Sequence, residues 1–394
     1  MKDEIENLLT RGVEKIFPSK EELEKVLRSG KKLRLYQGFD PSMPSLHLGN
    51  LLGLMKLRGF QKLGHEVIFL IGDFTGMIGD PTDKPAARKM LTREQALKNS
   101  ENWKTQAGKV LDFEGENPVK IMFNSTWNDQ VSFKDLIEIT SKFTVQQMLE
   151  REMFQERLKR NEPIFLHEFL YPVAQAIDSV KMDVDLELGG NDQTFNMLAG
   201  RTLMRALKGK EKFVMTTKLL VDKEGQKVGK TTGNALFLDS TPENFFGGIM
   251  SFPDEVIGLS FELLTEEPLD NLRDEIKSNP MGSKKRLAFT IVKQLWGEEL
   301  AQKAKESFEN VFQNRQAPQN APEVEFEPKE IEAGELVLKT GLVKSMTEAK
   351  RLIDNGAVEI NGATVNSHVA LITPQNGMLL KIGKTRFVKI KTKV

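Results

Sequence analysis

The hydrophobic positions between about residues 33 and 222 follow two alternating periods. Short apolar runs typical of buried strands occur at LRLYQGF (33–39), EVIFLIGDF (66–74), KIMFNS (120–125), DVDLELGG (183–190) and KFVMTTKLLVD (212–222). Segments of helical period separate them, as in LLGLMKLRGFQKLG (51–64). Strands that alternate with helices predict an α/β fold, with a parallel sheet covered on both faces.

Two stretches depart from this rhythm. Residues from about 109 to 163 read as an insertion, and its charged amphipathic part, FTVQQMLEREMFQERLKR (143–160), predicts a helix. That helix could pack on a partner subunit or lie solvated on its own domain, and the pattern does not choose between them. From residue 241 to about 313 the signals are helical throughout, which indicates a separate helical domain or subdomain.

The C-terminal part differs from the rest in composition. Residues 316–333 contain three Pro and five Glu against one Lys, which predicts a stiff acidic linker. Residues 334–394 carry ten Lys and Arg against four Asp and Glu, a local net charge of +6. Such a module is suited to meet a polyanion, although a basic tail that only aids solubility is the alternative.

Composition narrows the function classes. The 394 residues hold 56 Lys and Arg against 56 Asp and Glu, and no Cys. A disulfide, a thiol nucleophile and a cysteine zinc site are therefore excluded, and any metal must have oxygen or His ligands or arrive with the substrate. The charged, helical start MKDEIENLLTRGVEKIF is not a signal sequence, and no apolar run is long enough to cross a bilayer. We expect a soluble, cytoplasmic protein.

The first candidate site is the segment YQGFDPSMPSLHLGN (36–50). It runs from a strand end through a Pro-rich turn into a helix, where unpaired backbone N–H groups favour an anion such as phosphate. His47 and Asn50 add side-chain donors, and Gly49 allows close backbone approach. By itself the segment is ambiguous, because His47 could simply cap the helix and Gly49 could serve packing.

A second candidate lies some 180 residues later, in GQKVGKTTGN (225–234). Lys227 and Lys230 on a Gly-rich loop are suited to stabilise negative charge that develops during a reaction. A solvated β-turn is the plainer interpretation of the GTTGN part.

Together, HLGN and KVGKT resemble the HIGH and KMSKS signatures of class I aminoacyl-tRNA synthetases. The departures are Asn50 at the second His of HIGH, and Gly229 and Thr231 within KMSKS, whereas both Lys are kept. The resemblance implies that these residues stabilise the α-phosphate and the leaving pyrophosphate while an amino acid carboxylate attacks ATP.

Three further motifs bear on the amino acid: TGMIGDP (75–81), YPVAQAID (171–178) and GGNDQTFN (189–196). Tyr171, Gln175 and Asp178 are spaced i, i+4 and i+7, so a helix would place them on one face. The stripe either faces water or is buried, where its polar groups need partners.

These motifs resemble the tyrosyl-tRNA synthetase family over essentially the whole chain. The resemblance implies that Tyr36 and Asp178 bind the substrate phenol, since a phenol needs both a donor and an acceptor. It implies that Asp80, Tyr171 and Gln175 hold the ammonium group and that Gln193 lies by the carboxylate, with Thr75 in the same pocket. The residues implied to contact ATP are Gly38, Asp40, Ser42, His47, Gly49, Asn50, Gly190, Asp192 and Lys230. Those implied to act on the phosphates are His47, Asn50, Lys227, Lys230, Thr231 and a basic pair, Lys84 and Arg88.

The C-terminal module resembles the S4 RNA-binding domain. A helix start at Ser345 places Lys350 and Arg351 on a short helix, with Lys344 just before it, and a tight Asn-Gly turn at 361–362 follows. These three basic residues are the candidates for binding tRNA. The resemblance implies tRNA(Tyr), L-tyrosine and ATP with Mg²⁺ as substrates, no protein-bound metal, no membrane and a homodimer.

The predicted architecture therefore has three folded parts. Residues 1–222 form a Rossmann-like parallel-sheet catalytic domain with an inserted dimerisation segment at about 109–163. Residues 223–315 carry the KMSKS-type loop and an α-helical, anticodon-stem-binding domain. After the linker at 316–333, residues 334–394 form a small α+β, S4-like domain.

Three alternatives stay open on the sequence. A tryptophanyl-tRNA synthetase would share the fold and the phosphate motifs, but an indole has no acceptor and would make one hydroxyl redundant. A synthetase-like RNA-binding protein would have lost its chemistry, whereas His47, Lys227 and Lys230 are intact. Another nucleotidyl transferase would have no use for the basic module.

Overall fold

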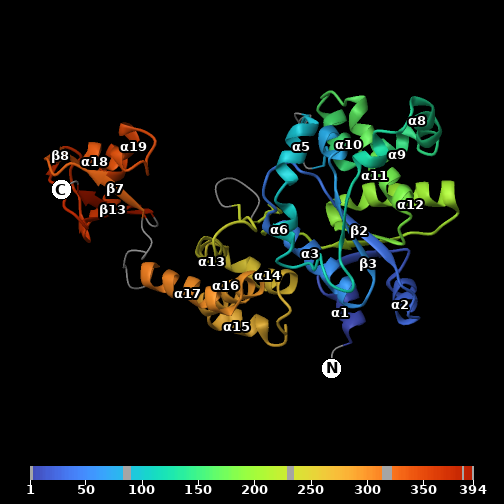
Figure 1. Ribbon diagram of the computed structural model, residues 1–394, viewed down its shortest axis with the longest axis horizontal. Coiled ribbons are helices and arrows are strands. Elements are labelled where there is room, and N and C mark those ends of the chain that lie inside the picture. The colour runs from blue at the N-terminus through green and yellow to red at the C-terminus, as the bar shows by residue number, and fades with distance from the viewer. Residues whose placement is uncertain (1–2, 83–89, 229–234, 313–321, 384–385, 393–394) are drawn as a thin grey trace. The chain divides into compact units, whose positions relative to one another are not determined.

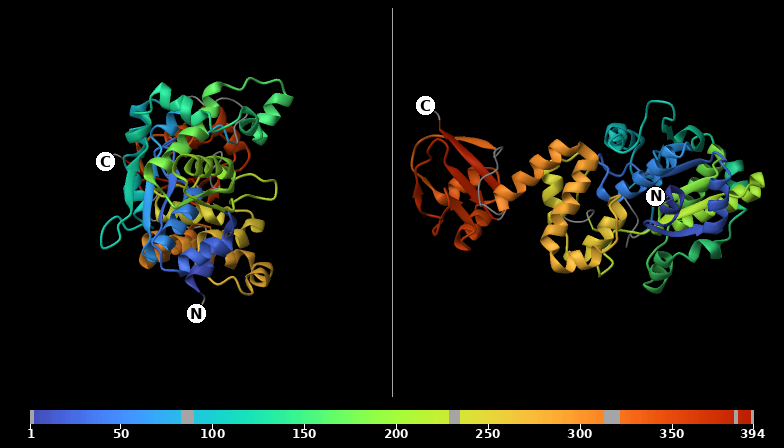
Figure 2. Two further views of the ribbon diagram at one scale, coloured as in Figure 1. Left: turned by 90° about the vertical axis from the view of Figure 1, so that its right-hand side faces the viewer. Right: turned by 90° about the horizontal axis from the view of Figure 1, so that it is seen from below.

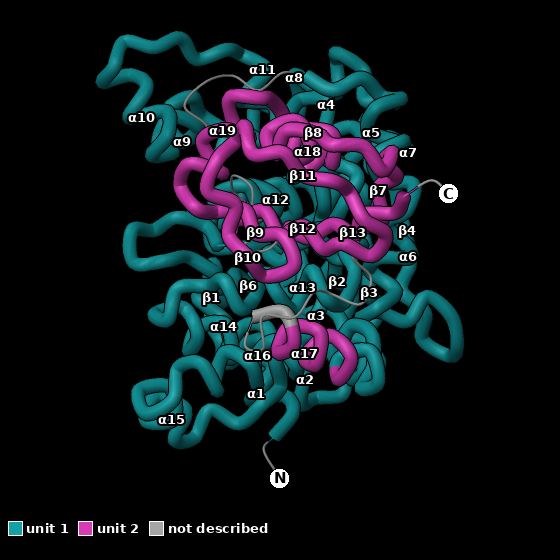
Figure 3. The backbone as a smooth tube through the Cα atoms, turned by 90° about the vertical axis from the view of Figure 1, so that its left-hand side faces the viewer, with its two compact units in different colours: residues 1–301 teal, residues 302–394 magenta. Residues whose placement is uncertain are grey.

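The computed structural model describes residues 3–82, 90–228, 235–312, 322–383 and 386–392. The chain divides into two compact units, residues 1–301 and 302–394 (Figure 3). Each unit has its own sheet, so each is described by itself.

Unit 1 is built on a six-stranded sheet in the order β1-β6-β5-β2-β3-β4 (Figure 1). Its strands are β1 (Val13–Phe17), β2 (Arg34–Phe39), β3 (Glu66–Ile71), β4 (Lys120–Phe123), β5 (Leu186–Gly190) and β6 (Phe213–Thr217). Strands β2 to β6 pair in parallel, and β1 pairs antiparallel with β6. The strand order reverses between β2 and β5, the place where open parallel sheets bind ligands.

Helices cover both faces of this sheet (Figure 2). Those up to β6 are α1 (Glu4–Thr10), α2 (Lys20–Arg28), α3 (Leu48–Lys62), α4 (Thr75–Ile78), α5 (Arg93–Ser100), α6 (Trp103–Ala107), α7 (Ser125–Asn128), α8 (Phe133–Thr140), α9 (Val145–Leu149), α10 (Glu152–Lys159), α11 (Leu166–Met182) and α12 (Thr194–Lys208). On one face, α11 and α12 pack against Tyr36, Ile68 and Leu70. On the other, α3 contacts β3, and Trp103 meets the ring of Phe69 edge-on at 6.4 Å. The predicted parallel sheet with helices on both faces is confirmed.

Three local expectations are wrong. The N-terminal segment is not helical throughout, because its last part forms the edge strand β1 after a turn at Gly12, which has φ +66°. Strand β4 belongs to the sheet although it falls inside the predicted insertion at 109–163. The stretch at 143–160 is also two short helices, α9 and α10, because Arg151 between them has extended backbone.

The segment after β6 is helical, as the sequence predicts. It contains α13 (Pro242–Met250), α14 (Ile257–Leu264), α15 (Leu272–Ser278), α16 (Pro280–Trp296) and α17 (Glu298–Phe312), the last of which crosses the boundary between the units. Arg11 ties this region to the sheet, since its guanidinium donates to the carbonyls of Phe261, Glu262 and Glu267. Residues up to 301 thus pack as one unit with the six-stranded sheet, whereas the sequence predicted a separate helical domain or subdomain. No helix among the described residues has the length and apolarity needed to cross a membrane.

Unit 2 is a small α+β module. Its five-stranded sheet has the order β10-β9-β12-β13-β7, beside a two-stranded β11-β8 pair. The elements are β7 (Glu323–Phe326), β8 (Ile331–Glu332), α18 (Ala333–Lys339), α19 (Met346–Asp354), β9 (Val358–Ile360), β10 (Ala363–Thr364), β11 (Leu371–Ile372), β12 (Leu379–Ile382) and β13 (Arg386–Thr392). The predicted helix start is present, because Ser345 accepts from the Glu348 N–H, and the predicted turn is present at Asn361 and Gly362, both with positive φ.

The linker predicted at 316–333 is wrong for its second half. Strand β7 pairs in parallel with β13, and β8 pairs with β11, so residues 323–332 belong to the sheets of unit 2. Val324 and Phe326 alternate with glutamates and pack on the core of the unit, while the glutamates face outward. The acidic composition therefore reflects a half-exposed edge strand.

Candidate active site

A cavity of about 770 Å³ lies at the carboxyl ends of the sheet strands of unit 1. That volume lies within the range of small-molecule sites. Sixteen of the predicted residues line it: Tyr36, Gly38, Asp40, Ser42, His47, Gly49, Asn50, Thr75, Asp80, Tyr171, Gln175, Asp178, Gly190, Asp192, Gln193 and Lys227. Lys84, Arg88, Lys230 and Thr231 lie outside the described residues. The fold thus gathers the early, middle and late motifs around one space.

The segment that follows the second motif pairs with the start of α3 through the backbone. The Leu48 N–H donates to the Leu236 carbonyl at 2.8 Å, and the Leu238 N–H donates to the Leu46 carbonyl at 2.8 Å. The chain that follows the KVGKT loop is therefore held against the start of α3. Segments some 190 residues apart in sequence flank one helix N-terminus.

His47 is the N-cap residue of α3 and has extended backbone. The backbone N–H of His47 donates to Asn50 Oδ1 at 2.9 Å, so the Asn50 amide nitrogen remains to donate to a ligand. A Cβ at Gly49 would lie 3.0 Å from two atoms of the His47 ring, so glycine there lets the imidazole lie close to the helix. Both side chains line the cavity at the first turn of α3, where the Leu48 N–H is used by Leu236 and the Asn50 N–H by the His47 carbonyl.

Residues 220–228 form the base of the second motif. The Val228 N–H donates to the Leu220 carbonyl at 2.9 Å, and the Gly225 N–H to the Asp222 carbonyl at 3.0 Å, so the segment turns back on itself. Lys227 Nζ forms an ion pair with Asp192 Oδ2 at 2.7 Å. The ammonium is therefore held at the cavity by a carboxylate at the end of β5.

Asp40, Thr75 and Tyr171 form a hydrogen-bonded group at the end of β2. Asp40 accepts from the Tyr171 hydroxyl at 2.8 Å and from the Thr75 hydroxyl at 2.7 Å. A Cβ at Gly72 would lie 2.1 Å from Asp40 Oδ1, so only glycine leaves room for this carboxylate. Burial, together with the neighbouring carboxylates, raises the pKa of Tyr171 well above its usual value, so the phenol stays neutral. Its oxygen can still accept from a ligand.

Asp80 is surrounded by donors. Its Oδ2 accepts from Gln193 at 2.7 Å, and its Oδ1 accepts from Thr82 at 2.7 Å and from Arg151 at 3.4 Å. Arg151 lies between the rings of Phe154 and Phe195 and is almost fully buried. The guanidinium thus links the inserted helices to a carboxylate of the cavity.

Asp178 lies deep in the cavity within a cage of three donors. Its Oδ1 accepts from Trp127 Nε1 at 2.7 Å and from Asn128 at 2.9 Å, and its Oδ2 accepts from Asn124 at 3.1 Å. Burial is the largest influence and raises the pKa of Asp178 to about 8, against the three hydrogen bonds, which lower it. Tyr171 and Asp178 are buried and line the cavity, so the polar stripe of α11 faces the cavity and not the solvent.

We expect the pKa of Asp178 to control the affinity of the cavity for a ligand donor below about pH 8. The folded-state pKa of about 8 exceeds the unfolded value of about 3.9, so the protonated carboxyl group stabilises the folded state. This stabilisation is complete below about pH 4 and is lost as the pH rises through about 8. A ligand group that donates to the ionised carboxylate should therefore lose affinity about tenfold per pH unit below about 8, measured as the binding constant against pH. A flat profile between about pH 6 and 8 would contradict this.

Tyr36 and Gln175 complete the wall. The Tyr36 hydroxyl lies 3.0 Å from Ser179 Oγ, and Gln175 donates to Glu187 at 2.9 Å. Burial is the main cause of the strongly raised pKa of Tyr36, which therefore stays a neutral phenol. Because the Gln175 nitrogen is used by Glu187, its carbonyl oxygen remains to accept from a ligand.

Sequence reasoning missed the residues that support Asp178. Asn124, Trp127 and Asn128 lie in NSTWN (124–128), immediately after strand β4. Asn124 also accepts from the Phe74 N–H at 2.8 Å, so its amide orientation is fixed. A polar side chain at the carboxyl end of a parallel strand is a signal that could have identified Asn124.

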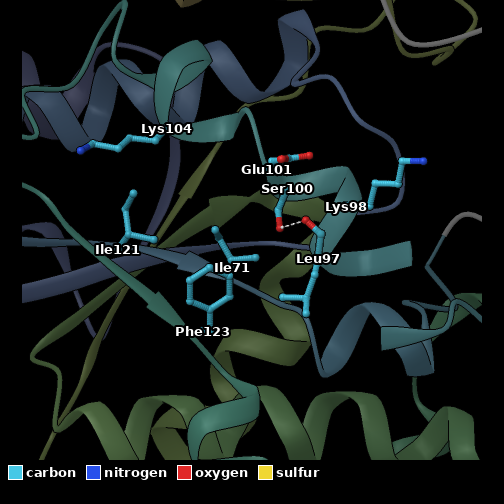
Figure 4. A pocket seen from close by; sticks show the side chains of 8 residues that line it. All are labelled: Ile71, Leu97, Lys98, Ser100, Glu101, Lys104, Ile121 and Phe123. Carbon is cyan, nitrogen blue, oxygen red and sulfur yellow. Dashed lines mark hydrogen bonds between the residues drawn. The ribbon is translucent and has the colours of Figure 1, made fainter. Parts of the chain in front are cut away.

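A second, shallower pocket lies beside edge strand β4 (Figure 4). It is lined mainly by apolar groups such as Leu97, Ile121 and Phe123, and the Ser100 hydroxyl donates to carbonyls of its own helix. It contains none of the predicted site residues, so it has no part in the site described above.

In unit 2, the three predicted RNA-binding residues share one region. Lys344 directly precedes the N-cap of α19, and Lys350 and Arg351 are in that helix. All three side chains are exposed. These side chains carry positive charge at the surface and are not part of the hydrophobic core of unit 2.

The family models and curated relatives cover nearly the whole chain. Residues 28–313 match the family described as tRNA synthetases class I (W and Y), and residues 313–388 match the Tyrosine--tRNA ligase SYY-like C-terminal domain. The Tyrosine--tRNA ligase of Aquifex aeolicus is 44% identical over 374 residues, which are 94% of each chain. That of Thermotoga maritima is 40% identical over 390 residues, covering 97% of this chain and 96% of the relative.

A solved structure of similar fold is a C-terminally truncated mitochondrial tyrosyl-tRNA synthetase of Aspergillus nidulans. It matches with a TM-score of 0.65 and 21% identity, covering 79% of this chain and 95% of that one. At this identity the likeness supports the fold alone.

Proposed function

The chain belongs to the tyrosine--tRNA ligase family of class I aminoacyl-tRNA synthetases, and from this premise we propose how its residues divide the work. The enzyme attaches L-tyrosine to tRNA(Tyr) with ATP, by the two-step class I route through a tyrosyl-adenylate. The observation that carries the residue assignment is the single cavity lined by every described residue of the predicted tyrosine and ATP sites.

The phenol of tyrosine binds between Tyr36 and Asp178. The two side chains come from opposite layers, β2 and α11, and both line the cavity. A hydroxyl donor and a carboxylate acceptor match the two hydrogen bonds of a phenol, whereas phenylalanine would leave both buried groups unpaired. An indole would leave the hydroxyl unpaired.

The ammonium group of tyrosine binds at the acceptors that the cavity keeps open. The Gln175 carbonyl and the Tyr171 oxygen can accept, because their own hydrogens are donated to Glu187 and Asp40. The Asp80 carboxylate supplies the opposite charge. This arrangement places the substrate carboxylate toward Gln193 and the phosphate motifs.

ATP binds along the start of α3. The ribose lies at Gly190 and Asp192, and the phosphates lie at His47, Asn50 and the helix N-terminus, where N–H groups and the helix dipole favour anions. When Asp192 hydrogen-bonds the ribose, its ion pair with Lys227 breaks, and the Lys227 ammonium can then bind the phosphates. We propose that Lys84, Arg88, Lys230 and Thr231 complete the phosphate site, and that Mg²⁺ enters bound to the ATP phosphates.

The chemistry is positioning and charge stabilisation. A carboxylate oxygen of tyrosine attacks the α-phosphorus, the bond to the bridging oxygen breaks, and pyrophosphate leaves. His47 and Lys227 donate to the negative charge that grows in this transition state. In the second step a ribose hydroxyl of the tRNA attacks the tyrosyl carbonyl and AMP leaves, without any covalent enzyme intermediate.

ATP–pyrophosphate exchange with tyrosine, phenylalanine and tryptophan side by side tests the pocket assignment. Exchange with tyrosine, weakened by Tyr36→Phe, is expected. Exchange that is supported better by tryptophan would overturn the placement of the phenol between Tyr36 and Asp178.

We propose that the basic surface of α19 binds tRNA(Tyr). Lys350→Glu with Arg351→Glu should leave pyrophosphate exchange unchanged, while the KM for tRNA in aminoacylation rises at least tenfold, because two phosphate contacts become repulsive. The dependence of the KM on salt should also become shallower. Lys329→Glu, a single exposed charge reversal elsewhere in unit 2, is the control. An equal loss in that control would contradict a specific role for α19.

We also propose that the enzyme is a homodimer, with the inserted helices at its interface. Between residues 133 and 166 the described chain exposes six large apolar side chains, namely Phe133, Ile137, Val145, Leu158, Phe165 and Leu166. Phe133 and Leu166 are 79% and 82% exposed. Apolar exposure of this density marks a surface that associates.

Charges on this surface should separate the subunits. We expect Phe133→Asp with Ile137→Asp to shift the sedimenting species from twice the 44.5 kDa chain mass to the single chain. Met281→Asp, at an exposed apolar position on α16, is the control and should remain dimeric. A wild-type protein that sediments as a monomer at micromolar concentration would refute the proposal.

A further inference from the structure

A buried group of charged side chains lies behind the wall of the cavity. Lys212, just before β6, is 0% exposed, Glu187 of β5 is 1% exposed, and Ser179 of α11 is 0% exposed. None of the three is among the residues that line the cavity. A buried ion pair is expensive to desolvate and is often replaced by apolar residues without loss of stability, so this one calls for another explanation.

Lys212 is the centre of the group. Its Nζ donates to Ser179 Oγ at 2.9 Å and to the Met197 carbonyl at 3.1 Å, and forms an ion pair with Glu187. A Cβ at Gly200 would lie 2.5 Å from Lys212 Nζ and 2.7 Å from Ser179 Oγ. Helix α12 thus leaves space for the ammonium by having glycine at this position.

Two hydrogen bonds lead from this group to the cavity. Glu187 Oε1 accepts from Gln175 at 2.9 Å, and Ser179 Oγ lies 3.0 Å from the Tyr36 hydroxyl. Gln175 and Tyr36 both line the cavity. The buried ammonium is therefore one hydroxyl away from the group assigned to the substrate phenol.

The direction of these hydrogen bonds depends on charge. An ammonium only donates, an ionised carboxylate only accepts, and a serine hydroxyl has one proton to give. Ser179 can give its proton to Glu187, at 3.3 Å, or to Tyr36, at 3.0 Å. Glu187 already accepts from Lys212 and Gln175, and the bond from Ser179 to Tyr36 is the shorter of the two, so the Ser179 proton is assigned to Tyr36 and the Tyr36 proton is left to point into the cavity.

We propose that Lys212 is a positioning residue for tyrosine recognition, which keeps Tyr36 a hydrogen-bond donor to the substrate phenol through Glu187 and Ser179. Without the ammonium, ionised Glu187 accepts the hydrogen bond from the Ser179 hydroxyl. The Tyr36 hydroxyl then donates to Ser179 and no longer to the substrate. The phenol oxygen of the substrate loses its donor. This inference rests on the proposed function, because it takes Tyr36 to face the phenol.

The test compares L-tyrosinol with L-phenylalaninol as competitive inhibitors of tyrosine-dependent pyrophosphate exchange. The ratio of their inhibition constants isolates the phenol contact. Lys212→Gln removes the charge but keeps an N–H donor. We expect it to reduce the selectivity for tyrosinol about tenfold, the value of one hydrogen bond, with the KM for ATP unchanged.

Three variants separate this role from a structural one. Lys212→Gln with Glu187→Gln should restore the selectivity, because a neutral residue 187 no longer attracts the Ser179 proton. Lys56→Gln is the matched control, since Lys56 is another buried lysine, bonded to the Leu8 carbonyl, and should leave selectivity unchanged. Ser179→Ala keeps the ion pair and so tests the pathway if Lys212→Gln does not fold. It should also lower the selectivity, because the Tyr36 proton then turns to Glu187.

The outcomes distinguish this inference from the proposed function. If Tyr36→Phe lowers the selectivity for tyrosinol but neither Lys212→Gln nor Ser179→Ala does, the role of Lys212 is overturned and the pocket assignment stands. If Tyr36→Phe leaves the selectivity unchanged, the placement of the phenol at Tyr36 is wrong. Equal weakening of both inhibitors by Lys212→Gln also overturns the proposal, because it indicates a loss of packing alone.

Discussion

Asp178→Asn is expected to lower kcat/KM for tyrosine in pyrophosphate exchange about 100-fold above about pH 8, where the Asp178 carboxyl group is ionised. The substitution removes the negative acceptor for the phenol, and hydrogen bonds to a charged group contribute about 1.5–3 kcal/mol. Competition by phenylalaninol, which has no phenolic hydroxyl, should change little. The kinetic loss should fall mainly on tyrosine KM, since the group contacts the substrate in the ground state and in the transition state alike.

The cage around Asp178 adds a cost in stability. An Asn side chain at 178 keeps one oxygen for Trp127 and Asn128 but turns its NH₂ group toward the NH₂ group of Asn124. The Asn124 amide cannot rotate to offer its oxygen, because that oxygen already accepts from the Phe74 N–H. A buried donor without a partner costs about 1–3 kcal/mol, so the melting temperature should fall.

Asp183→Asn is the matched control for Asp178→Asn. Asp183 ends the same helix in the left-handed conformation, which Asn tolerates well. If Asp183→Asn weakened tyrosine activation as much, or if Asp178→Asn left the affinity for tyrosine unchanged, the assignment of Asp178 to the phenol would be wrong.

Lys227→Met is expected to lower kcat of pyrophosphate exchange about 100- to 1,000-fold, the range found when one donor to a developing charge is removed. The apolar stem is kept, so only the ammonium is lost. In the unliganded protein that ammonium binds Asp192 at 2.7 Å, at the cavity and next to the start of the phosphate loop. Tyrosine affinity, measured by equilibrium dialysis, should be unchanged because the phenol and ammonium sites lie elsewhere in the cavity.

Lys223→Met is the control for charge and location. Lys223 precedes the same turn, and its side chain is 71% exposed, so the change should leave kcat within about twofold, as for exposed positions generally. A comparable loss in Lys223→Met would point to a general effect of local charge. An unchanged kcat in Lys227→Met would refute a role for this ammonium in the transition state.

The fold class and the motifs could be predicted because they depend on local patterns. Buried strands and amphipathic helices repeat with periods of two and 3.6 residues, so the alternation between residues 33 and 222 indicated a parallel sheet. Two motifs that resemble a family signature, in the family's order, indicated the chemistry. The i, i+4, i+7 spacing of Tyr171, Gln175 and Asp178 correctly indicated one helix face.

The errors arose where composition and structure disagree. The acidic segment at 323–332 resembled a linker because glutamates outnumber its apolar residues, yet Val324 and Phe326 suffice to seat an edge strand on the core of unit 2. Likewise β1 was hidden in a charged start, because an antiparallel edge strand buries only part of its side chains.

The sequence by itself determined the kind of fold and the family, since helix and strand periods and short motifs are properties of neighbouring residues. Only the tertiary structure decided which partners those residues have. The donors around Asp178 come from a segment about 50 residues earlier, the start of α3 pairs with residues 236–238, and Lys212 reaches Tyr36 through Glu187 and Ser179. Such contacts depend on the order of the strands in the sheet and on which buried polar groups form hydrogen bonds with each other. Neither property produces a local pattern in the sequence.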